Sequence, residues 1–159
     1  MIAACIPEVL SLSAGETLGS MFFTPILGSH EITGEPPYIR VRICFLGGVM
    51  SIGHSDSAAP GGHLDVEVSR EAADLIAANF LAADSSSVPD HRVDDVLCEL
   101  ANIVCGNVLS AIASRPGFTL LSPEIIRGEG GMWPETECFV ECFDLEQGWL
   151  TVRLVLKSS

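Results

Sequence analysis

The sequence predicts an α+β fold in which a mainly antiparallel sheet packs against long helices. Three observations carry this prediction. The segment from Pro89 to about Ser114 has the periodicity of a long amphipathic helix. Apolar and polar residues alternate along Tyr38–Leu46, as in a half-buried strand. The last three predicted strands follow one another without an intervening helix, as antiparallel strands do.

The first half of the chain predicts one helix and up to three strands. Apolar residues recur at helical spacing over Ile6–Met21, and the strand Tyr38–Leu46 follows a segment rich in proline and glycine. Val49–Gly53 is short but would complete a hairpin with that strand. The polar loop His54–Gly62 then leads to a further strand over Leu64–Val68.

Two helices are predicted next, each with a recognisable start. Ser69 is a good N-cap for a helix whose apolar face includes Phe80 and which should end in the serine-rich loop that follows. Ser87 and Asp90 resemble a capping box, so the longest helix is expected to begin there and to run to about Ser114. The remaining strands are predicted around Phe118–Ser122, Glu137–Phe143 and Trp149–Leu156.

Length and composition predict one folded domain over residues 1–159. Hydrophobic residues make up 48% of the chain and charged residues only 18%, which is typical of a folded globule. The net charge of -13, with no basic stripe, argues against binding to nucleic acid or to acidic lipid. The longest charge-free apolar run, Thr17–Ser29, is too short to span a membrane.

The cellular location follows from the N-terminus and the cysteines. Met1–Glu8 lacks the basic start and apolar run of a secretory signal, so we expect a cytoplasmic protein. The six cysteines lie inside apolar segments, where thiols act as small buried hydrophobic groups in a reducing compartment.

The longest predicted helix carries a polar stripe opposite its apolar face. With 100° per residue, Asp95, Glu99, Asn102 and Gly106 fall within about 60° of arc. A glycine in mid-helix costs about 1 kcal/mol relative to alanine, so another backbone or a partner molecule is expected to come close to Gly106, although packing within the chain explains it equally well. The opposite, core-facing side holds Val96, Leu97, Leu100, Ile103 and Val104.

The stripe resembles the signature of the CheC, CheX and FliY phosphatases. That signature is an acid and an amide at positions i and i+3 of a helix, followed later in the chain by a proline. Here these residues are Glu99, Asn102 and Pro123, preceded by Asp95, and one residue fewer separates Asn102 from Pro123 than in the CheC pattern. Other segments that are similar to the family, in the same order, are Glu16–Gly19, Phe45–Gly53, Glu99–Asn107, Leu121–Gly128 and Phe139–Leu156.

This resemblance implies a CheX-type phosphatase that acts on the phospho-aspartate of a CheY-like response regulator. Asn102 would orient the attacking water and Glu99 would pair with a lysine of the regulator, while Asp95, Gly106 and Pro123 would support binding. The regulator would supply Mg²⁺, so no cofactor is expected on this chain. The resemblance also implies a homodimer formed by continuing the sheet, for which Glu137–Phe143 is the candidate edge.

The family pattern also places a counterpart of this helix near the start of the chain. There Glu16 is followed by Gly19 instead of an amide, so one active site per chain is expected.

Three other interpretations stay open. The chain could be a binding module that docks a response regulator or a flagellar switch component without catalysis. An enzyme based on cysteine would need an exposed thiol with a lowered pKa. A metal site formed by His54, Asp56, His63 and Asp65 would match no standard ligand spacing, so we expect no metal.

Overall fold

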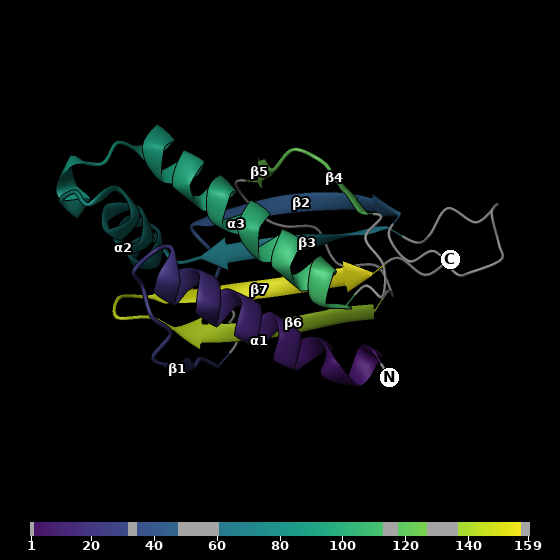
Figure 1. Ribbon diagram of the computed structural model, residues 1–159. Coiled ribbons are helices and arrows are strands. Elements are labelled where there is room, and N and C mark those ends of the chain that lie inside the picture. Colours follow the sequence, from purple (N-terminus) through teal and green to yellow (C-terminus); the bar gives the residue numbers. More distant parts are fainter. Residues whose placement is uncertain (1, 32–34, 48–60, 113–117, 127–136, 157–159) are drawn as a thin grey trace, which may run out of the picture.

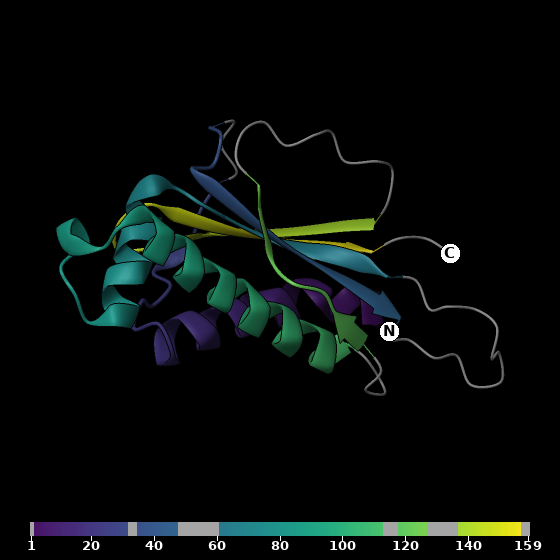
Figure 2. The ribbon, with the colours of Figure 1, turned by 90° about the horizontal axis from the view of Figure 1, so that it is seen from above.

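The computed structural model describes residues 2–31, 35–47, 61–112, 118–126 and 137–156. A seven-stranded sheet forms one layer, and the helices cover one of its faces (Figures 1 and 2). The helices are α1 (Ile2–Ser20), α2 (Arg70–Leu81) and α3 (Asp90–Ile112), with a 3₁₀ turn η1 (Ser85–Ser87) before α3. The strands are β1 (Gly28–Ser29), β2 (Ile39–Gly47), β3 (Gly62–Val68), β4 (Phe118–Leu120), β5 (Glu124–Ile126), β6 (Glu137–Asp144) and β7 (Trp149–Leu156).

All strand pairs in the sheet are antiparallel, as the sequence predicted. The strand order is β1-β6-β7-β3-β2-β4, and β5 also pairs with β2. The predicted strand Val49–Gly53 and most of the loop that follows it lie outside the described residues. Within the described part of the chain, β2 pairs with β3, β4 and β5.

The alternation along β2 separates an apolar face from a charged face. Ile39, Val41 and Ile43 are buried in the core, opposite Val68, Val66 and Leu64 of β3. The intervening side chains of β2 point to the other face, where three arginines that are scattered in the sequence pair with two acids of β3. The ion pairs are Arg40 with Glu67, Arg42 with Asp65 at 2.9 Å, and Arg153 with Glu67 at 3.1 Å. Buried charges require such partners.

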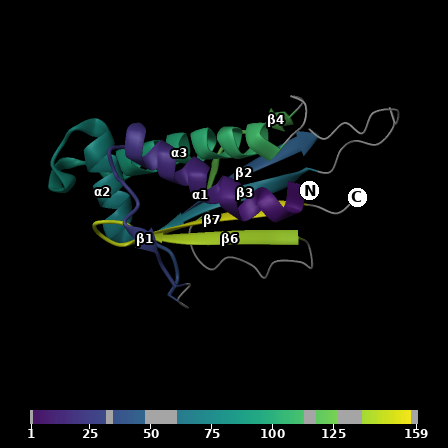
Figure 3. The same cartoon turned by 60° about the horizontal axis from the view of Figure 1, so that its bottom comes forward.

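The helices α1 and α3 lie side by side over the sheet and run in opposite directions (Figure 3). The Asn107 side chain of α3 donates from Nδ2 to Oγ1 of Thr17 on α1, at 3.3 Å. At the start of α2, the predicted N-cap is confirmed, because Oγ of Ser69 accepts from the backbone N–H of Ala72.

One detail of the helix prediction is wrong. Ser87 belongs to η1, where its hydroxyl donates to the Asp84 carbonyl at 2.8 Å, and α3 begins only at Asp90, so Ser87 is not the N-cap of a capping box. Phe80 lies on the apolar face of α2 as expected, because its ring stacks on the buried ring of Phe22, and the residue is 37% exposed in the last turn of the helix.

Helix α3 is long and apolar enough by composition to cross a membrane. Half of its most apolar stretch is buried inside the fold. Its apolar face contacts α1, α2 and the sheet, which is the position of a core helix.

Candidate active site

The polar stripe of α3 faces solvent, and this confirms the orientation predicted from the sequence. Asp95, Glu99 and Asn102 are exposed. On the opposite side the apolar residues are buried, apart from Ile103, which is half-buried; the buried ones are Val96, Leu97, Leu100 and Val104. The acid and the amide are therefore held one turn apart on a helix that the core fixes in place.

An open pocket of about 340 Å³ lies between the end of α2 and the first turns of α3. Asp95 and Glu99 line it, whereas Asn102 lies about one turn further along α3 and is not a lining residue. The sequence analysis assigned no part in a functional site to the other four lining residues, which are Phe80, Leu81, Arg92 and Val96. Only the spacing Arg92-x₂-Asp95-x₃-Glu99, which sets these three residues on neighbouring positions of one helix face, could have indicated part of this pocket from the sequence.

Gly106 lies at the far end of the stripe and is half-buried. A Cβ atom built on it meets nothing within 4 Å among the described residues. Packing against the described part of the chain therefore does not explain the glycine, and the close approach of a partner stays a prediction.

Pro123 lies between β4 and β5 and is half-buried. It is not one of the residues that line the pocket beside Glu99. Its supporting role stays a prediction, as do the roles of the other four site residues.

The counterpart surface on α1 lacks the acid and amide pair. Glu16 and Gly19 are exposed, and a Cβ on Gly19 would meet nothing among the described residues within 4 Å. The helix contains no asparagine or glutamine. This agrees with one site per chain.

The described thiols with resolved pKa shifts do not resemble activated nucleophiles. Burial raises the pKa of Cys98, and the nearby acids Asp94 and Asp95 raise it further. Burial, with a smaller effect of Cys44, raises the pKa of Cys105 to about 12. Burial also raises the pKa of Cys142. A catalytic thiol needs the opposite shift, so these three cysteines do not support a cysteine-based enzyme.

The metal-site alternative finds no support in the part of the chain that the structure describes. Within it, no group of three or more histidine, cysteine or acidic residues could hold a metal ion. Asp65 is fully buried and pairs with Arg42. Of the other three candidates, His63 lies in β3, and His54 and Asp56 lie outside the described residues.

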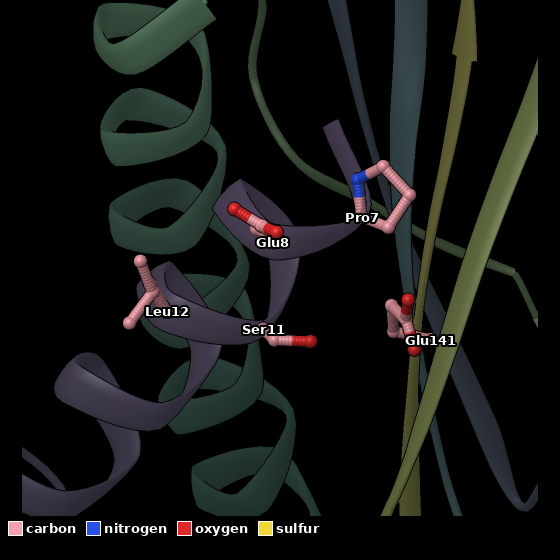
Figure 4. A pocket seen from close by; sticks show the side chains of 5 residues that line it. All are labelled: Pro7, Glu8, Ser11, Leu12 and Glu141. Atoms are coloured by element: carbon pink, nitrogen blue, oxygen red, sulfur yellow. The ribbon is translucent and has the colours of Figure 1, made fainter. Parts of the chain in front are cut away.

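A second pocket of about 370 Å³ lies between α1 and the edge strand β6 (Figure 4). In Figure 4, Ser11 points from α1 toward the side of Glu141, and Leu12 points away from it. The lining residues are Pro7, Glu8, Ser11, Leu12 and Glu141. The lining residues include two carboxylates but no histidine or lysine that could activate the serine hydroxyl, so the geometry favours no chemistry there.

Comparison with known protein families decides the family to which the chain belongs. The family described as chemotaxis phosphatase CheX matches residues 50–143, which is more than half of the sequence. The chain belongs to the CheX family. Its family match includes the whole of α3, and therefore Asp95, Glu99, Asn102 and Gly106.

Solved structures agree with this assignment at the level of the fold. The chemotaxis protein CheX of Vibrio vulnificus matches with a TM-score of 0.71 and 15% identity, covering 94% of this chain and 95% of the other. A CheC-like superfamily protein from Shewanella sp. PV-4 matches with a TM-score of 0.72 and 14% identity, with coverages of 96% and 97%. CheX in a CheX–CheY–BeF₃–Mg²⁺ complex from Borrelia burgdorferi matches with a TM-score of 0.70 and 16% identity, with coverages of 95% and 97%. No curated protein sequence gives a significant match.

Proposed function

We propose that this CheX-family chain is a phosphatase for the phospho-aspartate of a CheY-like response regulator. The observation that carries the proposal is the placement of Glu99 and Asn102, exposed and one turn apart on the polar face of a buried helix. The family match supports the reaction, and the CheX relative solved with CheY supports the class of partner.

Asn102 is proposed to orient the attacking water in line with phosphorus. Phosphoryl transfer needs positioning and charge stabilisation more than covalent chemistry, and good placement of a nucleophile is worth several kcal/mol. A carboxamide suits this role because its oxygen accepts a hydrogen bond from water while its NH₂ group donates elsewhere. The exposure of Asn102 leaves it accessible to a docked partner.

Glu99 is proposed to pair with the lysine of the regulator and so to set the register of docking. An exposed ion pair contributes only about 0.2–1 kcal/mol. Glu99 cannot hold the partner alone, and most of the binding must come from the surface around it.

The chain itself is proposed to bind no cofactor. In the Borrelia complex, Mg²⁺ and BeF₃ accompany CheX and CheY. For this chain we expect Mg²⁺ to arrive with the regulator, where it would offset the charge of the phosphoryl oxygens. We expect the reaction to take place in the cytoplasm and residues 1–159 to act as one domain.

A homodimer is proposed to form through the outer edge of β6. β1 pairs only with Phe143 and Asp144, so within the described residues the first part of β6 has no strand on its outer side. An open edge of this kind can add a strand from a second copy. Light scattering would give twice the monomer mass of 16.9 kDa for a dimer, and the monomer mass at micromolar concentration would contradict this proposal.

The test is the decay of a phosphorylated CheY-like receiver domain with and without the protein. We expect the wild-type chain to accelerate decay, and we expect Asn102→Ala and Glu99→Ala to abolish or greatly reduce the effect. Binding without acceleration would favour the binding-module alternative. The absence of both binding and acceleration with several receivers would contradict the proposed function.

Matched controls separate a catalytic effect from a general one. Asn107→Ala removes another amide of α3, whose side chain donates to Thr17 on α1. Glu16→Ala removes the exposed acid of the counterpart helix α1. Both variants should accelerate decay as the wild type does, and a large loss in Glu16→Ala would indicate a second site.

A further inference from the structure

The pocket beside Glu99 has two walls of different chemistry. Helix α2 contributes the apolar side chains of Phe80 and Leu81, and α3 contributes Arg92 together with the acids Asp95 and Glu99. A partner that docks on Glu99 therefore lies directly beside this pocket, because Glu99 is part of its wall.

The apolar wall is held in a fixed position. The Phe80 ring, which is 37% exposed, stacks on the fully buried ring of Phe22 with centroids 4.6 Å apart. The neighbouring Asn79 donates from Nδ2 to the carbonyl of Phe23 at 3.2 Å and to Oγ1 of Thr24 at 3.0 Å. These contacts tie the last turn of α2 to the segment that follows α1, so the wall is preorganised for binding.

Two left-handed backbone conformations lie in the segments that form this corner. Phe23 and Ala82 both have φ of 53°, and among the described residues they are the non-glycine residues with positive φ. Ala82 is the C-cap of α2, and its backbone N–H donates to the carbonyls of Ala78 and Asn79, so it ends the helix beside the pocket. Phe23 offers its carbonyl to Asn79, so its conformation belongs to the same fixed corner.

Arg92 is the one basic residue among the six that line the pocket. It is the only arginine or lysine of α3, a helix that also carries Asp90, Asp94, Asp95 and Glu99. Its side chain is exposed and forms no ion pair with the described residues. On a chain with a net charge of -13, this guanidinium can donate hydrogen bonds to a carboxylate of a partner that the neighbouring acids would repel.

We propose that this pocket binds the receiver domain by taking one of its apolar side chains against Phe80 and Leu81, while a neighbouring receiver carboxylate pairs with Arg92. The inference rests on the proposed function and adds the surface that sets the affinity for the regulator. Asn102 lies outside the pocket, so docking and the orientation of water depend on different residues. Apolar anchors in preformed pockets, together with arginines, commonly dominate the energy of an interface.

The experiment measures binding of a receiver domain activated with beryllofluoride and Mg²⁺, and then the dephosphorylation kinetics of the phosphorylated receiver. The variants are Phe80→Ala and Arg92→Glu. Each should raise the Kd and the KM about tenfold or more, while kcat at saturating receiver stays within about twofold of the wild-type value. Arg92→Lys should restore part of the affinity, because it keeps the charge but loses the planar fork.

The chain offers a matched control in Leu12→Ala. Leu12 is 63% exposed and lines the separate pocket between α1 and β6. This variant should leave the Kd and the KM within about twofold of wild type. A thermal melt checks that Phe80→Ala is folded, and Arg92→Glu changes an exposed side chain without an ion pair to the described residues, so it tests the pocket independently.

The outcomes separate this inference from the proposed function. If the wild type accelerates decay but both variants keep the wild-type KM, or lose kcat alone, the docking inference is wrong and the phosphatase proposal stands. If the wild type binds the activated receiver without accelerating decay, and both variants weaken that binding, the docking inference holds and the phosphatase proposal fails. Absence of wild-type binding contradicts both.

Discussion

Replacing Gly106 by alanine tests whether a partner comes close to the end of the polar stripe. The Cβ of alanine would meet nothing within 4 Å among the described residues, so it adds no clash with them. Alanine is favoured over glycine in a helix interior by about 1 kcal/mol. For a chain of this size, that gain should raise the Tm by roughly 2–4 °C.

The same substitution should impair activity. If the docked receiver packs against the bare helix backbone at Gly106, an added methyl group overpacks the interface at a cost of roughly 1–3 kcal/mol. We therefore expect a more stable protein whose kcat/KM for the phosphorylated receiver falls about fivefold or more. Thermal unfolding and receiver decay, measured on the same preparation, provide both values.

Gly19→Ala is the matched control, because Gly19 lies on the counterpart helix α1 and its Cβ would also meet nothing within 4 Å. It should raise the Tm, by less than Gly106→Ala since Gly19 is close to the end of its helix, and leave kcat/KM unchanged. A lower Tm for Gly106→Ala would mean that the glycine is needed for packing. A higher Tm with unchanged kcat/KM would refute a close approach of the partner at this position.

Three further predictions concern stability. Ala82→Gly should raise the free energy of unfolding in urea by about 0.5–1 kcal/mol because it relieves the left-handed backbone, whereas Ala78→Gly inside α2 should lower it by about 1 kcal/mol or more; equal signs would contradict this. Ser69→Ala should lower the unfolding free energy by about 1–2 kcal/mol, since Oγ accepts hydrogen bonds from the N–H groups of the first turn of α2 and of Trp149; an unchanged urea midpoint would show that the cap contributes little. Burial raises the pKa of the Cys105 thiol from its ordinary value of 9.0 to about 12. As the pH rises, the unfolded state therefore loses this proton first, and the free energy of unfolding should fall between pH 9 and 12. Urea titrations across that range should show a smaller fall for Cys105→Ala than for the wild type, and equal falls would refute the assignment.

Helix α3 and its polar stripe could be predicted from the sequence because helical periodicity is local. The positions of Glu99 and Asn102 on the wheel depend only on the 100° step between residues, and the buried face supplied by Leu97 and Leu100 fixed the direction of the stripe. The alternation along β2 was predicted for the same reason, since a strand repeats every two residues. The resemblance of these segments to the CheX family then pointed to the family that the comparison supports.

The surroundings of the stripe could not be predicted, because they join residues far apart in the chain. Periodicity placed Phe80 on the apolar face of α2, but only the packing of α2 against the segment that follows α1 shows that its ring stacks on Phe22 and remains partly exposed. The choice between packing and partner approach at Gly106 likewise required knowing what lies within reach of its Cβ.

The sequence by itself determined the helix, the exposed acid and amide, and the family, because each is written in a short stretch of residues. Only the tertiary structure decided that the end of α2 forms a pocket with Glu99, and that Arg40 and Arg153 both pair with Glu67. The physical reason is the same in both cases. Strand order and helix packing bring together side chains that are separated by tens of residues, and nothing local specifies which of them will meet.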